Sequence, residues 1–393
     1  MPALLSELEN DGFVVPNFEL SNLKVGQEIG SARNGNLTGD RDKKIFLIID
    51  GFGHNMVEKL EERGRDAAKA LRKAEDVKRI TTVFPSTTMN VLTSIYGTMP
   101  TADHGVVGTA IFLKEAGIMI NCIAMAALVN PKGLGLDTYD AGLVFPKGHI
   151  LDGAKKAERR VKVMYPEFIT KRNGQWSMFR EENVIPYTSL TEMLVRMAKE
   201  VRDDGCDYIV AYYDVFDHIE HVYSQESEEA LEEIDATIMA IDRLIVPLLK
   251  KHGWNLIITA DHGQVKTPKQ GEDVLEWNDP VMDLLTMPPW GESRALFMQA
   301  KEGMDAKLED MFEKRWKEHA ILIDAEEAIR SGLFGRSAVN PAVRYRFGSH
   351  IAIAKGSHSI SYLFPGLKAK VFNAMGRHGG LSKDEMEIPL IIY

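Results

Sequence analysis

The chain has 393 residues, 45% of them hydrophobic, so it is long enough to form a sizeable core. Its formal net charge of -10 excludes a broad cationic surface of the kind that binds nucleic acid or anionic lipid. Its two cysteines, Cys122 and Cys206, exclude a disulfide framework and a cysteine-based zinc site. Because we find no apolar leader and no stretch suited to span a bilayer, we expect a cytoplasmic protein without a membrane partner.

The first elements follow a polar stretch over residues 1–43, which we expect to form an N-terminal extension. The continuous apolar run Ile45–Ile49 stops at Asp50-Gly51, a pattern typical of a strand buried on both faces of a parallel sheet. A charged helix follows, and then a second short strand near Arg79–Val83. A further helix is expected to begin at Thr88, directly after a turn that contains proline.

The middle of the chain predicts an alternation of strands and helices. Residues from about 110 to 185 have poorly defined periodicity, and we assign them to connections and an inserted layer. The elements expected after them are a helix over Met193–Val201, a strand over Tyr208–Tyr213, an acidic helix from about Ser227 to Lys251 and a strand over Asn255–Ala260. This order indicates βαβ units, and the predicted fold class is α/β with a mostly parallel central sheet flanked by helices.

The last part of the chain adds a further module to this core. We expect strands over Ala295–Gln299 and His350–Ala354, with a charged helix over Lys307–His319 between them. The final residues, Ile388–Tyr393, predict a short strand that returns to the core. The predicted organisation is therefore an extension (1–43), an α/β core like that of the alkaline phosphatases (44–265 and 350–393) and an inserted cap-like module (266–349).

Acidic residues follow three of the predicted apolar strands. They are Asp50, then Asp214 and Asp217, and finally Asp261. Since ligands of open α/β sheets bind outside the carboxyl ends of the strands, we expect these side chains to converge on one edge. Carboxylates that lie so close together repel and raise one another's pKa, and bound divalent cations remove this cost.

Histidines accompany these carboxylates at spacings that suit metal ligands. Asp217 and His221 are four residues apart, so a helical turn places both on one face. Asp261 and His262 are consecutive at a predicted strand end, where the chain turns. Near the end of the chain His378 is surrounded by glycines, which suits a ligand delivered from a loop.

The candidate nucleophile is Thr88. At the start of a helix its hydroxyl lies where unpaired N–H groups and the positive end of the helix dipole favour an incoming phosphate. A free threonine hydroxyl is a weak nucleophile, but metal coordination would lower its pKa and activate it.

These residues together resemble the alkaline-phosphatase superfamily, in particular its nucleotide pyrophosphatase/type I phosphodiesterase family. Pro85, Thr88 and His104-Gly105 reproduce the spacing of the family's nucleophile segment. The other matching motifs occur in the family's order from about residue 45 to 390, and they are Asp50-Gly51, Asp217 with His221, Asp261-His262-Gly263 and His378-Gly379.

The resemblance implies a two-metal phosphohydrolase. One ion would be held by Asp50, Asp261 and His262 with Thr88, and the other by Asp217, His221 and His378. Zinc is the family's usual ion, and the mixed carboxylate and imidazole set would also accept manganese or iron. The implied reaction is hydrolysis of a phosphodiester or nucleotide pyrophosphate bond through a phosphothreonine intermediate. The expected partner is a small-molecule phosphate ester or nucleotide.

The nucleophile segment departs from the family pattern at one position. The family often has an Asn three residues after the nucleophile, but Val91 occupies that position and Asn90 lies one residue earlier. Either Asn90 binds the phosphoryl oxygens, or the register shifts and Thr87 is the nucleophile. The ungapped spacing of the segment favours Thr88.

Other readings of the same residues stay open. A phosphomonoesterase or a phosphonate hydrolase would share the metal core, although no arginine lies near Thr88 in the sequence to pair with the extra charge of a monoester. A non-catalytic protein or a metal-dependent mutase of the same fold is the alternative from another class, and the presence of all the predicted ligands favours catalysis. His358 is the alternative ligand in place of His378.

Overall fold

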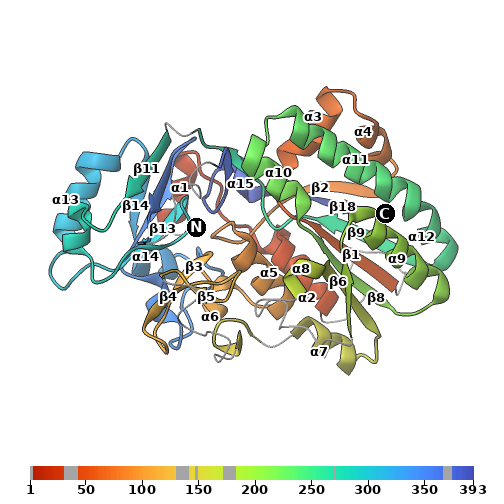
Figure 1. Cartoon of the computed structure of the whole chain (residues 1–393), viewed down its shortest axis with the longest axis horizontal. Helices are drawn as coiled ribbons and strands as arrows, with labels where there is room; N and C mark the ends of the chain where they lie inside the picture. Colours follow the sequence, from red (N-terminus) through yellow and green to blue (C-terminus); the bar gives the residue numbers. More distant parts are fainter. Residues whose placement is uncertain are drawn as a thin grey trace.

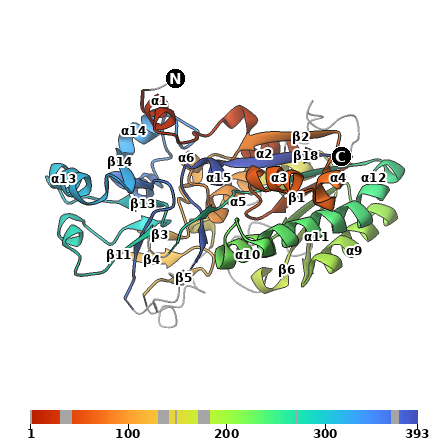
Figure 2. The same ribbon diagram turned by 90° about the horizontal axis from the view of Figure 1, so that it is seen from above.

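The computed structural model describes residues 3–30, 43–129, 141–146, 149–170, 183–268, 271–365 and 374–393. These residues form an α/β fold with two seven-stranded sheets, and the elements of the second sheet lie beside the helix-flanked central sheet in both views (Figure 1, Figure 2). No helix within these ranges combines the length and apolar character that a membrane span requires.

The central sheet is mostly parallel, as its apolar strands predict. Its order is β2 (Asp76–Thr81), β18 (Glu387–Ile392), β9 (Trp254–Thr259), β1 (Lys43–Ile49), β8 (Tyr208–Tyr213), β6 (Val161–Pro166) and β7 (Val184–Tyr187). The pairs β1 with β8, β1 with β9, β6 with β8 and β6 with β7 are parallel, and β18 pairs antiparallel with β9 and β2. The run Ile45–Ile49 is buried, which explains why it contains no polar residue.

Two groups of helices that pack among themselves flank this sheet (Figure 1). One group contains α3 (His54–Glu62), α4 (Asp66–Leu71), α9 (Leu190–Asp203), α10 (Val215–Tyr223), α11 (Glu228–Leu244) and α12 (Val246–His252), and the other contains α2 (Asn22–Gly30), α5 (Thr88–Gly97) and α7 (His149–Lys156). The single helix predicted from about Ser227 to Lys251 is in fact α11 followed by α12. Pro247 lies in the first turn of α12, where its missing N–H and fixed φ are tolerated.

The second sheet is antiparallel and mixes two distant parts of the chain. Its order is β14 (Ala320–Asp324), β15 (His350–Ala354), β13 (Ala295–Met298), β12 (Trp290–Gly291), β3 (Ala110–Leu113), β4 (Ile118–Asn121) and β5 (Ala126–Ala127). Two small sheets pair β10 (Val265–Lys266) with β17 (Gly376–Arg377) and β11 (Glu272–Leu275) with β16 (Ser359–Tyr362).

The other helical segments are α1 (Ala3–Asn10), η1 (Phe18–Leu20), α6 (Thr101–His104), η3 (Ala141–Leu143), α8 (Glu167–Thr170), η7 (Pro280–Leu284), α13 (Asp305–Trp316), α14 (Ala325–Arg330), η8 (Arg344–Phe347) and α15 (Lys383–Met386).

These pairings differ from the predicted division of the chain in two places. The strand His350–Ala354, assigned to the core with residues 350–393, pairs with β13 and β14 of the second sheet. Residues 110–127, assigned to connections and an inserted layer, supply β3, β4 and β5 of the same sheet. The second sheet is therefore not confined to 266–349. In the N-terminal part, Leu8 and Leu23 are buried in the main core, so the described part of 1–43 packs on the fold.

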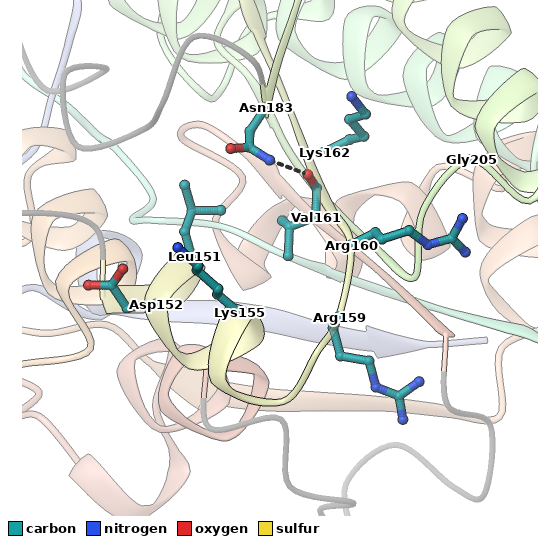
Figure 3. A pocket seen from close by; sticks show the side chains of 9 residues that line it. All are labelled: Leu151, Asp152, Lys155, Arg159, Arg160, Val161, Lys162, Asn183 and Gly205. Carbon is teal, nitrogen blue, oxygen red and sulfur yellow. Dashed lines mark hydrogen bonds between the residues drawn. The ribbon is translucent and has the colours of Figure 1, made fainter.

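A cavity of about 410 Å³ lies at the amino ends of β6 and β8, at the edge of the sheet opposite the strand ends that bear the predicted ligands (Figure 3). Its cationic lining residues are Lys155, Arg159, Arg160 and Lys162. In the close-up view their side chains fan out instead of pointing at a common centre. Arg160 also pairs with Asp204 and Asp207, so this cavity does not present a converged anion site.

Candidate active site

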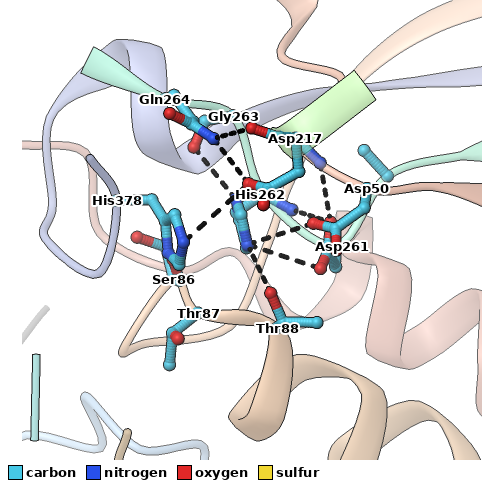
Figure 4. Close-up of polar contacts among 12 residues, drawn as sticks. Asp50, Ser86, Thr87, Thr88, Asp217, Asp261, His262, Gly263, Gln264 and His378 are labelled. Carbon is cyan, nitrogen blue, oxygen red and sulfur yellow. Dashed lines mark hydrogen bonds and ion pairs between the residues drawn. The ribbon is translucent and has the colours of Figure 1, made fainter. Parts of the chain in front are cut away.

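The topology brings the strand-end acidic residues to one edge of the central sheet. Strands β9, β1 and β8 are neighbours, and β1 runs parallel to both. Asp50 follows β1 and Asp261 lies just beyond β9, while Asp217 stands in the first turn of α10 after β8. Because the carboxyl ends of parallel strands share one edge, the three side chains meet there (Figure 4).

One group of polar side chains forms around His262. Its Nε2 lies 3.5 Å from Asp50 Oδ1 and 3.4 Å from Asp261 Oδ2. The same nitrogen lies 3.0 Å from Thr88 Oγ1 at the start of α5. His262 Nδ1 is 3.1 Å from the Gly263 carbonyl, so it carries the proton, and the Thr88 hydroxyl donates to Nε2.

A second group forms around Asp217. Its Oδ2 lies 3.3 Å from His221 Nε2, and its Oδ1 lies 3.9 Å from His378 Nε2. His378 also stacks on His262 with ring centroids 3.8 Å apart, which joins the two groups into one cluster (Figure 4). The structure thus brings all of the predicted ligands together, although they come from five separate stretches of the chain.

Backbone carbonyls fix the orientation of the two outer histidines. His221 Nδ1 lies 2.8 Å from the Gly376 carbonyl, and His378 Nδ1 lies 3.2 Å from the Ser86 carbonyl. Each carbonyl accepts the Nδ1 proton, so Nε2 is the ring nitrogen that faces Asp217 and that would bind a metal ion after losing its own proton. This arrangement is typical of histidines that ligate metals.

The donor set fits divalent metal ions. Within the described residues, one ligand atom each from Asp217, His221 and His378 lie within 4.8 Å of one another, and so do one each from Asp50, Asp217 and His262. Asp50 Oδ1 and Asp261 Oδ2 are buried and accept no hydrogen bond. A buried carboxylate oxygen without a donor is costly, and a cation in contact with it removes that cost.

The electrostatics of the cluster point the same way. Burial, together with the charges of Asp217 and Asp261, raises the pKa of Asp50 well above its usual value. Burial lowers the pKa of His221, but the Asp217 carboxylate outweighs this effect and raises that pKa to about 9. Burial also raises the pKa of Asp217, yet the neighbouring histidines hold it well below the usual range. Without a bound cation, the cluster therefore retains protons that metal binding would displace.

The two candidate nucleophiles point in different directions. Thr88 Oγ1 faces His262, whereas Thr87 Oγ1 donates to Glu292 Oε1 at 2.9 Å and points away from the cluster (Figure 4). Thr87 is fully buried at the N-cap of α5, and its side chain makes no cap hydrogen bond to the helix. The geometry therefore places Thr88, and not Thr87, beside the predicted ligands.

Asn90 does not line the site. Its Nδ2 donates to the Pro85 carbonyl at 2.6 Å, and its Oδ1 accepts a hydrogen bond from Thr101 Oγ1 at 2.8 Å. The side chain is fully buried and holds the turn that precedes α5. The phosphate contact predicted for Asn90 finds no support in this position.

Two other histidines with sequence-based predictions lie outside the cluster. His358 stacks on His319 with ring centroids 4.0 Å apart, so the structure places His378 and not His358 beside Asp217. His104 is buried, contacts Ser94 through Nε2 and accepts the Val106 N–H through Nδ1, so it organises the turn after α5.

A cavity of about 500 Å³ opens beside Thr88. Asp50, Asp217 and Thr88 are among its polar lining residues. Its other lining residues are mostly apolar or aromatic, and they are Met89, Leu92, Ile123, Tyr165, Phe168, Ile169, Tyr212, Asp214, Val215 and His218. Phe168 and Ile123 remain largely exposed at this cavity, which suits an apolar or aromatic group of a small molecule.

The comparison with known protein families agrees with this arrangement. The sequence profile described as type I phosphodiesterase/nucleotide pyrophosphatase matches residues 44–361, which is most of the chain. The chain belongs to this family. The type I phosphodiesterase family is part of the alkaline-phosphatase superfamily, so the resemblance seen in the sequence is confirmed.

Solved structures share the fold of this phosphodiesterase-family chain. Murine ectonucleotide pyrophosphatase/phosphodiesterase 5 is 17% identical with a TM-score of 0.65, and the match covers 89% of this chain and 87% of that one. Phosphonoacetate hydrolase from Sinorhizobium meliloti 1021, in complex with phosphonoacetate, is 16% identical with a TM-score of 0.64, and the match covers 88% and 89%. At these identities the likeness establishes the fold alone. A search of curated proteins gave no significant match.

Sequence reasoning missed three polar residues beside the site of this family member. The Tyr212 hydroxyl donates to Asp50 Oδ2, and Gln264 Nε2 donates to Asp217 Oδ1 at 2.5 Å. Tyr212 lies near the end of β8, and Gln264 directly follows the Asp-His-Gly motif. Their positions in the sequence therefore could have indicated that both lie near the site. Glu292 comes from the second sheet and had none.

Proposed function

We propose that the chain is a two-metal phosphohydrolase that cleaves phosphodiester or nucleotide pyrophosphate bonds through Thr88. The observation that carries this proposal is the position of the Thr88 hydroxyl, 3.0 Å from His262 at the start of a helix and beside two groups of metal-ligating side chains. Membership in a family named for these two reactions supports the substrate class.

Each predicted ligand has a place in this proposal. One ion would be held by Asp50, Asp261, His262 and Thr88, and the other by Asp217, His221 and His378. The mixed carboxylate and imidazole set suits zinc and also accepts manganese or iron. When bound, the two ions would supply Lewis acidity that lowers the pKa of the Thr88 hydroxyl and offsets charge on the phosphoryl oxygens.

The reaction that fits these groups has two displacement steps. Thr88 Oγ1 gives its proton to solvent and bonds to phosphorus while the bond from phosphorus to the leaving oxygen breaks, and the leaving oxygen takes up a proton from solvent. Water then attacks the phosphothreonine, which releases the phosphorylated product and restores the Thr88 hydroxyl. The start of α5 favours the anionic phosphoryl group through its N–H groups and dipole.

The cavity beside Thr88 supports an ester with an apolar or aromatic group. Among its described lining residues no lysine or arginine occurs, while Asp214 adds a carboxylate. A leaving group with its own carboxylate, such as that of phosphonoacetate, would find no positive side chain there. This favours diester or pyrophosphate cleavage over phosphonate hydrolysis, which is the activity named for one structural neighbour.

A panel of substrates with defined metal loading tests the proposal. The metal-free protein is reconstituted with zinc, manganese or iron and assayed with bis-p-nitrophenyl phosphate, p-nitrophenyl phosphate, a dinucleoside polyphosphate and phosphonoacetate. We expect kcat/KM to be largest for the diester or the polyphosphate and turnover to stop on chelation. Phosphonoacetate as the best substrate would move the assignment to phosphonate hydrolysis. No turnover with any metal would contradict catalysis and favour a binding protein.

A further inference from the structure

Glu292 contacts the turn that carries the nucleophile from the side of the second sheet. It directly follows β12, and its Oε1 accepts a hydrogen bond from Thr87 Oγ1 at 2.9 Å. The same oxygen accepts the Thr109 N–H at 2.5 Å. A carboxylate therefore lies beside the residue that immediately precedes Thr88.

Glu292 also packs against the loop that carries His378. A Cβ atom added to Gly379 would lie only 2.7 Å from the Cβ and 3.1 Å from the Cγ of Glu292. Gly379 has a φ of +119°, a conformation that favours glycine, so the close approach and the backbone agree. The Glu292 side chain thus lies between the segments that bear Thr88 and His378.

The arginines of this region each form an ion pair with another carboxylate, and the Glu292 charge also acts on Arg377 at longer range. Arg294 pairs with Glu385 at 2.7 Å, and Arg377 pairs with Glu272 at 2.7 Å. Over the described ranges, Glu292 forms no ion pair with a lysine or arginine. The second sheet therefore contributes a negative charge beside the turn that carries the nucleophile, where a monoesterase would gain from a positive one.

We propose that Glu292 is a charge-selective residue that disfavours dianionic phosphate monoesters and so directs the site toward monoanionic phosphodiesters. The proposal rests on the function assigned to Thr88 above. A fixed negative charge repels a dianion more strongly than a monoanion, and the partly buried position of Glu292 reduces the screening of this difference by solvent. Selectivity of this kind arises from repulsion of the wrong substrate as much as from attraction of the right one.

The variant Glu292→Gln separates charge from structure. The Gln Oε1 can accept both hydrogen bonds, from Thr87 and from Thr109, so the tie between the two sheets is retained while the charge is lost. Glu302→Gln makes the same change in net charge at an exposed position and serves as the matched control. Glu292→Met, which also lacks the charge, replaces Glu292→Gln if that variant unfolds at lower temperature than the parent.

The experiment compares the zinc-loaded wild type with both variants at pH 8. The ratio of kcat/KM for p-nitrophenyl phosphate to that for bis-p-nitrophenyl phosphate is measured first, since the two substrates share one leaving group. Binding of inorganic phosphate is then measured by titration calorimetry. We expect Glu292→Gln to raise the ratio about tenfold and to bind phosphate about tenfold more tightly, a change of about 1.4 kcal/mol. Glu302→Gln should change neither quantity.

The outcomes separate this proposal from the assigned function. An unchanged ratio and unchanged phosphate affinity in an active Glu292→Gln enzyme would show that Glu292 only ties the sheets together. If the metal-loaded wild type hydrolyses neither substrate, the assigned function fails, and phosphate binding alone then decides on Glu292. A weaker affinity for phosphate in Glu292→Gln would overturn the proposal in either case.

Discussion

The protein contains two clusters of charged side chains in its interior, and they differ in how far the chain itself neutralises their charge. Arg294 and Glu385 are both fully buried and form a bidentate pair, with distances of 3.0 Å and 2.7 Å. In the cluster of Asp50, Asp217 and Asp261, the first and last carboxylates are buried and Asp217 is partly buried. This cluster contains histidines in place of arginine, and two of its carboxylate oxygens accept no hydrogen bond. Charge that the chain itself does not balance marks the place where a cation is expected.

The pKa values reflect the same contrast. Burial raises the pKa of Glu385, but Arg294 and the hydrogen bonds from Ser382 and Gly380 outweigh it, and the pKa lies below its usual value. For Asp50, burial and the charges of its acidic neighbours act in the same direction, and the pKa lies well above its usual value. The first cluster is complete within the fold, whereas the second favours protons until a metal ion replaces them.

The largest expected effect is the loss of turnover in a variant that keeps all the charged side chains of the acidic cluster. Thr88→Ala removes the proposed nucleophile without changing any carboxylate or imidazole, so turnover should fall by at least about 1,000-fold while both ions stay bound. Steady-state kinetics and metal analysis of the purified variant measure the two quantities. Thr87→Ala is the control, and loss of activity in that variant with retention in Thr88→Ala would shift the register by one residue.

The next effect tests the pair of Arg294 and Glu385, which we call the balanced cluster because its two charges offset each other. Glu385→Ala leaves the Arg294 charge buried without its partner, so the free energy of unfolding should fall by about 3 to 5 kcal/mol. Denaturant unfolding in the presence of chelator measures this loss. The double variant Arg294→Met with Glu385→Leu should regain a large part of it, and a single variant as stable as the wild type would contradict the role of the pair.

Substitutions should change metal affinity only in the cluster of Asp50, Asp217 and Asp261, whose charge the chain does not balance. Asp217 contacts both His221 and His378, so Asp217→Ala should weaken binding of one ion by more than about 100-fold. Competition with a fluorescent chelator measures the affinity. Arg294→Lys, which keeps the charge of the balanced cluster, should leave both affinities within about threefold of the wild type. Equal metal affinity in Asp217→Ala and wild type would remove Asp217 from the site.

The smallest effect concerns the metal-free protein and depends on pH. Because the pKa of Asp50 is raised in the folded state, the metal-free fold loses stability as the pH rises from about 4 through that raised pKa. Asp50→Asn removes this charge, so at pH 8 the variant should be more stable than the wild type by about 1 to 2 kcal/mol. Unfolding in chelator at pH 5 and pH 8 gives the comparison, and a gain that shrinks as the pH rises would contradict it.

The sequence predicted the parts of the molecule that depend on strong local patterns. The run Ile45–Ile49 could only be a buried strand, and the acidic residues after β1, β8 and β9 follow from the rule that parallel strands present their carboxyl ends together. The helix at Thr88 begins where the sequence placed it. For the same reason the convergence of Asp50, Asp217 and Asp261 was predictable before any coordinates.

The features that sequence reasoning missed depend on pairing between distant segments. The run His350–Ala354 is as apolar as a core strand, and only its pairing with β13 and β14 shows that it belongs to the second sheet. The strands over 110–127 are short, and the pattern of apolar residues in them is too weak to predict strands. Glu292 stands on a turn between short strands, so no local pattern relates it to Thr87.

The order of strands in the central sheet has a consequence for how the chain folds. Gly51 and Asp261 touch although 210 residues separate them, and Tyr212 reaches Asp50 across 162 residues. Contacts of such long range form late in folding, because distant segments must first find each other. If the chain binds metal ions at this cluster, a refolding chain would therefore take them up only after β1 has paired with both β8 and β9, and metal uptake would report the closure of the sheet.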